Sequence, residues 1–186
     1  MPDKVWTVPA NGGESIVESY GYRTDVMPAY TNAEQRVQLR AVPLETLEFG
    51  IMAVEAREAQ LAVTTIFGTQ DEVVILPLWQ YGSRLVVDTL IGQSLFFTAD
   101  DVTNVPYRIN GHALLWRDPF TYELFRVTSL DPGGVSVLDP ATKNWLIGSM
   151  IFPARRARLP DRVALKQDST RVLTGRVQFT VEQDLP

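Results

Sequence analysis

The sequence has no cysteine and a single histidine, His112. Without cysteine the chain cannot form disulfides, use a thiolate nucleophile or bind a metal through sulfur. A single imidazole also excludes any site that needs two histidines from one chain. Several of the commonest catalytic and metal-binding chemistries of proteins are therefore excluded.

Long apolar runs are also missing. Residues 73–76 and 95–97 are among the longest, and both are far shorter than the roughly 20 residues that cross a bilayer as a helix. The N-terminus lacks the apolar stretch of a signal peptide. We expect a protein with no membrane span, which stays in the cytoplasm of the cell that makes it or enters a particle assembled there.

The net charge of the chain is −5, which does not predict non-specific binding to nucleic acid. The charge is uneven along the chain. Residues 151–186 contain seven basic and four acidic residues, a net charge of +3, which leaves −8 for residues 1–150. Opposite charges at the two ends suit head-to-tail contacts between subunits. The alternative is a solvated basic strand or loop.

Length and composition predict one domain with a true core, since 45% of the 186 residues are hydrophobic. Residues 1–20 contain Pro2, Pro9 and the turn Asn11-Gly12-Gly13, and we predict an extended N-terminal arm. Such an arm is often ordered only against a neighbour. Residues 21–186 are predicted to form a single β-rich domain.

Two helices are predicted in the first half of this domain. Asn32 is placed to cap a short helix at 33–41, with Gln35 completing a capping box and Pro43 ending the helix. The clearer pattern is a helical insertion at 52–67, where apolar residues recur at helical spacing before Gly68.

From residue 73 onward the sequence predicts strands. The apolar or alternating runs are 73–79, 85–90, 107–116, 122–127, 135–138, 146–152 and 176–181. Asn110-Gly111 lies between two apolar runs and predicts a hairpin, while residues 131–134 predict a turn. Turn residues recur about every eight to fifteen residues. We therefore predict a mainly β fold: a β-sandwich or barrel-like domain with an N-terminal extended arm and one or two short helices.

The polar residues do not form a recognisable reaction centre. His112 follows a turn without a carboxylate partner in the sequence, and Asp100 and Asp101 lie at a strand boundary, where acids solvate turns. Glycosidase chemistry needs two carboxylates held across a cleft, and Asp100, Asp101 and Asn104 miss the spacing of known calcium loops. We predict no catalytic, cofactor-binding or metal-binding residue; a hydrolase that uses Asp and Glu is the enzyme alternative.

The most informative feature is a polar block at residues 22–40. Its arginines offer planar forks that bind carboxylates such as Asp25 or Glu34 at two points. We interpret the block as a fixed polar joint between elements or subunits. Trp6 on the arm is a candidate interface anchor, and the arginines near residue 155 form a candidate charged rim. The predicted interface residues are Trp6, Tyr22, Arg23, Asp25, Glu34, Arg36, Arg40, Arg155, Arg156 and Arg158.

Five short motifs stand out along the chain: Tyr22-Arg23-Thr24-Asp25, Ala33-Glu34-Gln35-Arg36, Leu39-Arg40, Leu76-Pro77-Leu78-Trp79 and Ile151-Phe152-Pro153-Ala154-Arg155. In these motifs the chain resembles the bacteriophage distal tail or baseplate hub protein family and gene-transfer-agent tail proteins. The chain departs from the family pattern at Ala33, where relatives often have glycine, and at Leu44-Glu45, where they have paired arginines.

The resemblance implies a structural protein of the virion tail, assembled in the host cytoplasm, with no catalysis. It would form a ring, hexameric or trimeric, that joins the tail tube to the tip or baseplate. Its partners would be copies of itself, the tail tube protein and other tail-tip proteins. The alternative function is a carbohydrate- or receptor-binding β-sandwich at the tail tip, with Tyr107, Trp116 and Tyr122 supplying exposed aromatic rings.

Overall fold

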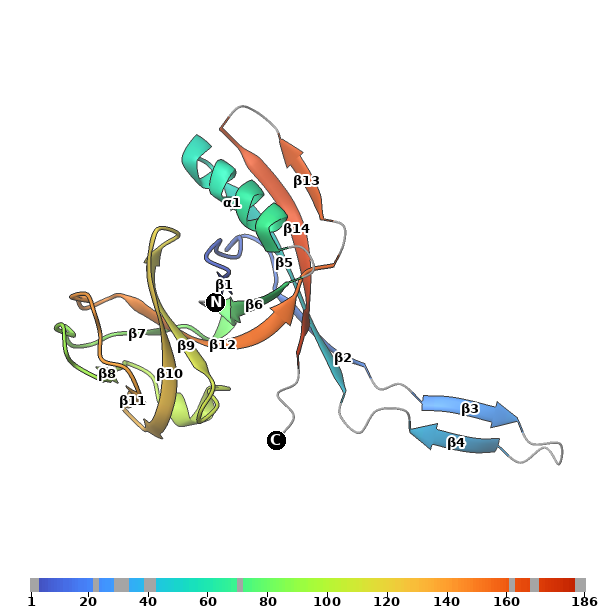
Figure 1. Cartoon of the computed structure of the whole chain (residues 1–186), viewed down its shortest axis with the longest axis horizontal. Helices are drawn as coiled ribbons and strands as arrows, with labels where there is room; N and C mark the ends of the chain where they lie inside the picture. Colours follow the sequence, from blue (N-terminus) through green and yellow to red (C-terminus); the bar gives the residue numbers. More distant parts are fainter. Residues whose placement is uncertain are drawn as a thin grey trace.

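The computed structural model describes residues 4–21, 43–69, 72–160, 163–167 and 171–182, and the backbone of residues 24–28 and 34–38 (Figure 1). In the first part of the chain the elements are β1 (Lys4–Val5), β2 (Val17–Gly21), β3 (Thr24–Pro28), β4 (Glu34–Gln38), β5 (Leu44–Ala53), α1 (Ala56–Thr69), β6 (Val73–Pro77) and the 3₁₀ turn η1 (Trp79–Tyr81). The remainder are β7 (Ser83–Arg84), β8 (Leu95–Phe97), the 3₁₀ turn η2 (Val102–Asn104), β9 (His112–Asp118), β10 (Thr121–Asp131), β11 (Gly134–Val137), β12 (Met150–Arg158), β13 (Ala164–Gln167) and β14 (Leu173–Val181).

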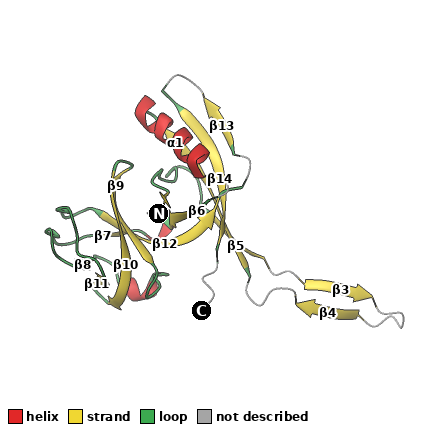
Figure 2. Cartoon of the chain, viewed as in Figure 1, coloured by secondary structure: helices red, strands yellow, loops and turns green. Residues whose placement is uncertain are grey.

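The predicted mainly β fold is confirmed (Figure 2). Twelve strands form one hydrogen-bonded sheet, whose longest path is β2-β5-β14-β12-β9-β10-β11-β8. This path does not close on itself in the described part of the chain, so the fold is sandwich-like. Strands β3 and β4 form a separate two-stranded sheet.

Two hydrophobic cores share strand β12. The first core lies between α1 and the strands that include β5, β6 and β14, and the second lies among β8 to β11. Residues 150–154 of β12 pair with β9, whereas residues 154–158 pair with β6 and the last two of these also pair with β14. Accordingly Ile151 packs in the second core and Ala157 in the first.

Helix α1 covers one side of the first core. Its buried residues are Ala62, Ile66 and Thr69, which recur at helical spacing on one face. The predicted helix at 52–67 is therefore present but shifted. Residues 52 and 53 extend strand β5, because Ala53 pairs with Leu173 of β14 and the ladder outweighs the local pattern.

The predicted helix at 33–41 is wrong. Residues 34–38 form strand β4, which pairs with β3 through Val26 opposite Arg36 and Asp25 opposite Val37. The capping-box pattern at Asn32 was a local signal only. Helix propensity differs by less than about 1 kcal/mol between most residues, so strand pairing overrides it.

The hairpin predicted at Asn110-Gly111 is also wrong in its position. Asn110 does adopt a positive φ of 64°, as the sequence suggests, and Gly111 donates a hydrogen bond to the carbonyl of Arg108 at 2.9 Å. This turn, however, leads into β9 from a segment that is not a strand. Strand β9 forms its hairpin with β10, through the turn at Pro119 and Phe120.

Candidate assembly surface

The β3–β4 hairpin extends from one end of the molecule (Figure 1). In the sequence the hairpin connects β2 to β5. These two strands pair with each other as far as Gly21, which stands opposite Leu44. Within the described residues, β3 and β4 form ladder pairs only with each other. The polar block singled out in the sequence is therefore centred on this hairpin.

Three of the predicted interface residues have a known register in the hairpin. Asp25 lies opposite Val37, Glu34 opposite Pro28 and Arg36 opposite Val26. None of the three charged residues is the direct partner of another. The arginine–carboxylate joint within this block stays a prediction, and Tyr22, Arg23 and Arg40 lie outside the described residues.

Trp6 lies in the first core of its own chain. Its side chain is 0% exposed, its ring meets Phe179 edge-on at 5.0 Å between centroids, and its Nε1 donates to the carbonyl of Val8 at 2.7 Å. A side chain with no exposed surface cannot anchor a neighbouring subunit by direct contact. Trp6 instead fixes the N-terminal segment to the sheet.

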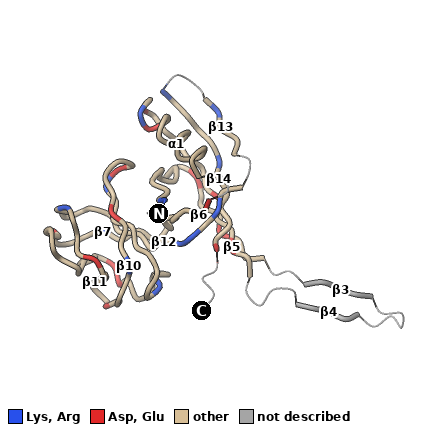
Figure 3. Tube along the Cα trace, in the orientation of Figure 1, with Lys and Arg blue, Asp and Glu red and all other residues tan. Residues whose placement is uncertain are grey.

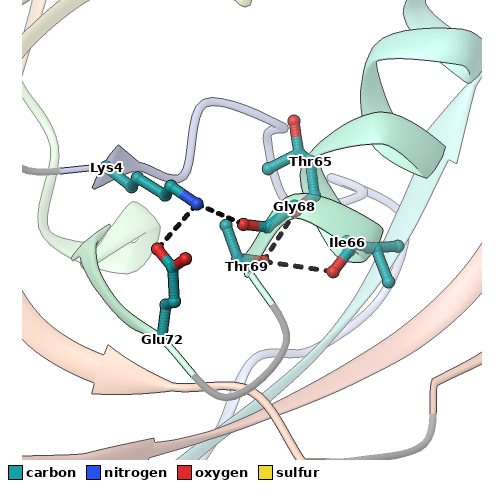
Figure 4. A network of polar contacts seen from close by, with 6 residues as sticks. All are labelled: Lys4, Thr65, Ile66, Gly68, Thr69 and Glu72. Atoms are coloured by element: carbon teal, nitrogen blue, oxygen red, sulfur yellow. Dashed lines mark hydrogen bonds and ion pairs between the residues drawn. The ribbon is translucent and has the colours of Figure 1, made fainter.

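The N-terminal segment is also held at Lys4, through a network at the end of α1 (Figure 4). The Lys4 ammonium donates to the carbonyl of Gly68 at 2.5 Å and lies 2.6 Å from a carboxylate oxygen of Glu72. The Thr69 hydroxyl donates to the carbonyl of Thr65 at 2.7 Å. A cation at a helix C-terminus is favourable because the last carbonyls carry partial negative charge. Strand β1 pairs with β6 beside this network.

The three arginines of the predicted charged rim fall into two environments. Arg155 is buried, with 6% of its surface exposed, and its guanidinium donates to the carbonyls of Ala154 and Pro106. Arg156 and Arg158 are exposed and both lie near Glu182, at 3.7 and 2.6 Å. Only the latter two can belong to a charged surface, and basic positions also mark β13 and β14 in Figure 3.

Glu45, Glu18 and two tyrosines gather where β2 and β5 lead towards the hairpin. Glu45 is only 8% exposed and stands opposite Tyr20, diagonally across the ladder from Glu18. Tyr20 and Tyr81 donate their hydroxyls to the Glu18 carboxylate. Burial raises the pKa of Glu45; the positive charges of Arg155 and Arg108 oppose this, and nearby Glu18 adds to it. The hydrogen bond to Glu18 also raises the pKa of Tyr20.

The raised pKa of Glu45 predicts a stability that depends on pH. Because the fold disfavours the ionised form, the contribution of Glu45 to the free energy of unfolding is complete below the ordinary pKa of 4.5 and is lost as pH rises through the higher folded-state pKa. Glu45→Gln should flatten this part of the profile, measured by urea denaturation at a series of pH values. The exposed Asp139→Asn is the matched control, and an unchanged profile in Glu45→Gln would contradict the assignment.

The remaining polar candidates have ordinary structural positions. His112 begins β9 and pairs with Arg126 of β10. Asp101 caps the turn η2, accepting hydrogen bonds from the Thr103 amide and hydroxyl, and these bonds lower its pKa. Within the described ranges, no group of three or more His, Asp or Glu side chains is close enough to hold a metal ion.

The aromatic residues of the carbohydrate-binding alternative do not share an exposed face. Tyr107 is buried, and its hydroxyl donates to the carbonyl of Ile151 at 3.3 Å. Trp116 and Tyr122 are half-buried partners on β9 and β10, and the Trp116 Nε1 donates to the carbonyl of Thr7 at 3.3 Å. The expectation that Tyr107 supplies an exposed ring is therefore wrong.

In the described segments, no helix combines the length and the apolar character needed to cross a bilayer. Comparison with known proteins adds no relative: no protein-family model matches the sequence, and no curated protein matches it significantly.

Proposed function

We propose that this protein is a structural subunit of a bacteriophage tail, forming a ring that connects the tail tube to the tip or baseplate. The proposal assigns it no catalysis. The motif resemblance described above supplies the biological setting. The projecting hairpin supports an assembly role on physical grounds.

The observation that carries the proposal is the isolation of β3 and β4. A two-stranded hairpin is marginally stable in water, and three or more strands, or packing against another element, are needed for independent stability. In the described part of the chain this hairpin has no further strand beside it. Contact with a neighbouring subunit would supply the missing packing, which is why we assign the hairpin to assembly.

The hairpin can be removed without cutting the sheet. Gly21 and Leu44 are direct partners in the β2–β5 ladder, so residues 22–43 can be replaced by Asn-Gly, which favours a tight two-residue turn. We expect the wild-type protein to form a ring in native mass spectrometry and light scattering. The shortened variant should keep its thermal transition and remain monomeric.

A matched control keeps the hairpin and changes an exposed residue elsewhere, such as Val54→Asp before α1. This variant should assemble as the wild type does. A wild-type protein that is monomeric at all concentrations and is absent from purified tails would refute the proposed function. A shortened variant that still forms the ring would refute the role of the hairpin.

A further inference from the structure

Two loops on the second core expose an unusual number of aliphatic side chains. One loop joins β7 to β8 and the other joins β11 to β12. Seven large aliphatic residues on them are between 44% and 65% exposed. Leu138 follows β11 directly, and the loop surface is defined as the other six: Val86, Val87, Leu90, Ile91, Leu146 and Ile147.

Hydrogen bonds hold the two loops together in one fixed arrangement. Thr89 and Trp145 exchange a pair of backbone hydrogen bonds, both 2.8 Å long. The amide of Ile147 donates to a carboxylate oxygen of Asp88 at 2.6 Å, and the amide of Gly148 to the carbonyl of Leu85 at 2.9 Å. Leu85 and Trp145 are themselves buried in the second core. The exposed aliphatic side chains therefore cannot turn inward without breaking the loops.

A hollow continues the loop surface towards β9. It has a volume of about 280 Å³, and its lining includes Trp116, Arg117, Leu146, Ile147 and Met150. A rigid apolar surface beside a hollow is a typical protein-contact site, because its exposure to water is unfavourable and its shape is already formed.

We propose that the loop surface is the docking site for the β3–β4 hairpin of a second copy of this chain. This inference rests on the proposed function and names the acceptor for its hairpin. The strands β7, β8 and β11, which border the loops, lie at one end of the longest axis, and β3 and β4 lie at the other (Figure 1). The hairpin and the strands that border the loop surface therefore lie at opposite ends of one copy.

The hairpin sequence suits such an acceptor. Its strands contain Val26, Met27 and Val37 among polar residues, which offers apolar groups to the loop surface. A contact between two different surfaces of identical chains is head-to-tail, and it closes into a ring when the rotation between neighbours allows. The same contact repeated around a ring would cover the β3–β4 hairpin and the loop surface of every copy.

The absence of cysteine allows a direct test by cross-linking. One set of subunits carries Val26→Cys or Met27→Cys, and a second set, tagged to change its mass, carries Ile91→Cys or Ile147→Cys. Two adjacent hairpin positions sample both faces of the strand, since neighbouring residues point to opposite sides. After mixing and oxidation, we expect dimers that join one subunit of each set, mapped to these positions by mass spectrometry.

The second measurement uses exposed substitutions that the fold should tolerate. The double variant Ile91→Asp, Ile147→Asp should raise the dissociation constant of the ring about tenfold or more. Val54→Asp is the matched control, and an unchanged thermal transition shows that the variants still fold.

Cross-links confined to hairpin–hairpin or loop–loop pairs would overturn the inference. A ring that forms with the aspartate variant as readily as with the wild type would also overturn it, leaving the proposed function standing. A wild-type chain that never associates would overturn both.

Discussion

Replacing Arg155 with methionine is expected to lower the free energy of unfolding by about 3–5 kcal/mol at neutral pH. The guanidinium is buried in β12, and its charge opposes the unfavourable burial of Glu45. Methionine fills similar space without the charge, so the buried carboxylate of Glu45 would lose one nearby positive charge while the negative charge of Glu18 remains. The loss should grow as pH rises, because ionised Glu45 then lacks its nearby cation.

Two further variants separate this effect from a change of packing. Arg155→Met combined with Glu45→Gln should recover a large part of the lost stability, since it removes both charges and leaves neither of them buried alone. Arg156→Met is the matched control, because Arg156 is exposed and lies 3.7 Å from Glu182, a surface contact worth less than about 1 kcal/mol. Chemical denaturation of the monomeric form measures the free energy of unfolding of the three variants. Equal losses of that free energy in Arg155→Met and Arg156→Met would contradict the buried-charge account.

Replacing Trp6 with alanine is expected to lower the free energy of unfolding by about 3–5 kcal/mol, because it empties a large site in the first core. The indole is fully buried, lies against Phe179 and donates a hydrogen bond to Val8. In a protein of this size the change should lower the melting temperature by roughly 6–20 °C. Scanning calorimetry on the wild type and the variant measures it.

The same experiment distinguishes the two roles that Trp6 could have. If Trp6 anchored a neighbouring subunit, Trp6→Ala would weaken assembly and leave the melting temperature of the monomer unchanged. Val17→Ala is the matched control on β2, where the side chain is 41% exposed. It should leave the melting temperature nearly unchanged.

Truncation of residues 1–12 should also lower the free energy of unfolding, because it removes β1 together with Trp6 and Val8.

The sequence predicted the β character and several strands because their patterns are local. Residues 122–127 alternate apolar and polar, and residues 131–134 combine Asp, Pro and Gly, so β10, the following turn and β11 lie where expected. The helix at 52–67 was predicted in kind but not in its bounds, because the extension of β5 depends on pairing with β14.

The errors arose where partners distant in the sequence decide the structure. A short segment with Pro2 and Pro9 has the composition of a free arm, and only the contact of Trp6 with Phe179 reveals its place in the core. Arg155 and Arg156 are adjacent in a basic cluster, yet the sheet buries one and exposes the other. The loop surface has no motif at all; the signal available was the run at residues 85–90, which was predicted to be a strand.

The positions of paired strands along the sequence also constrain how the chain folds as it is synthesised. Strands β8 to β11 lie within residues 95–137, so the ladder of the second core can close while later segments are still inside the ribosome. Strand β5 must wait much longer, since Ala53 pairs with Leu173. Until that late partner emerges, the edge of β5 that faces β14 is open to mispairing with other nascent chains, although its other edge can already pair with β2.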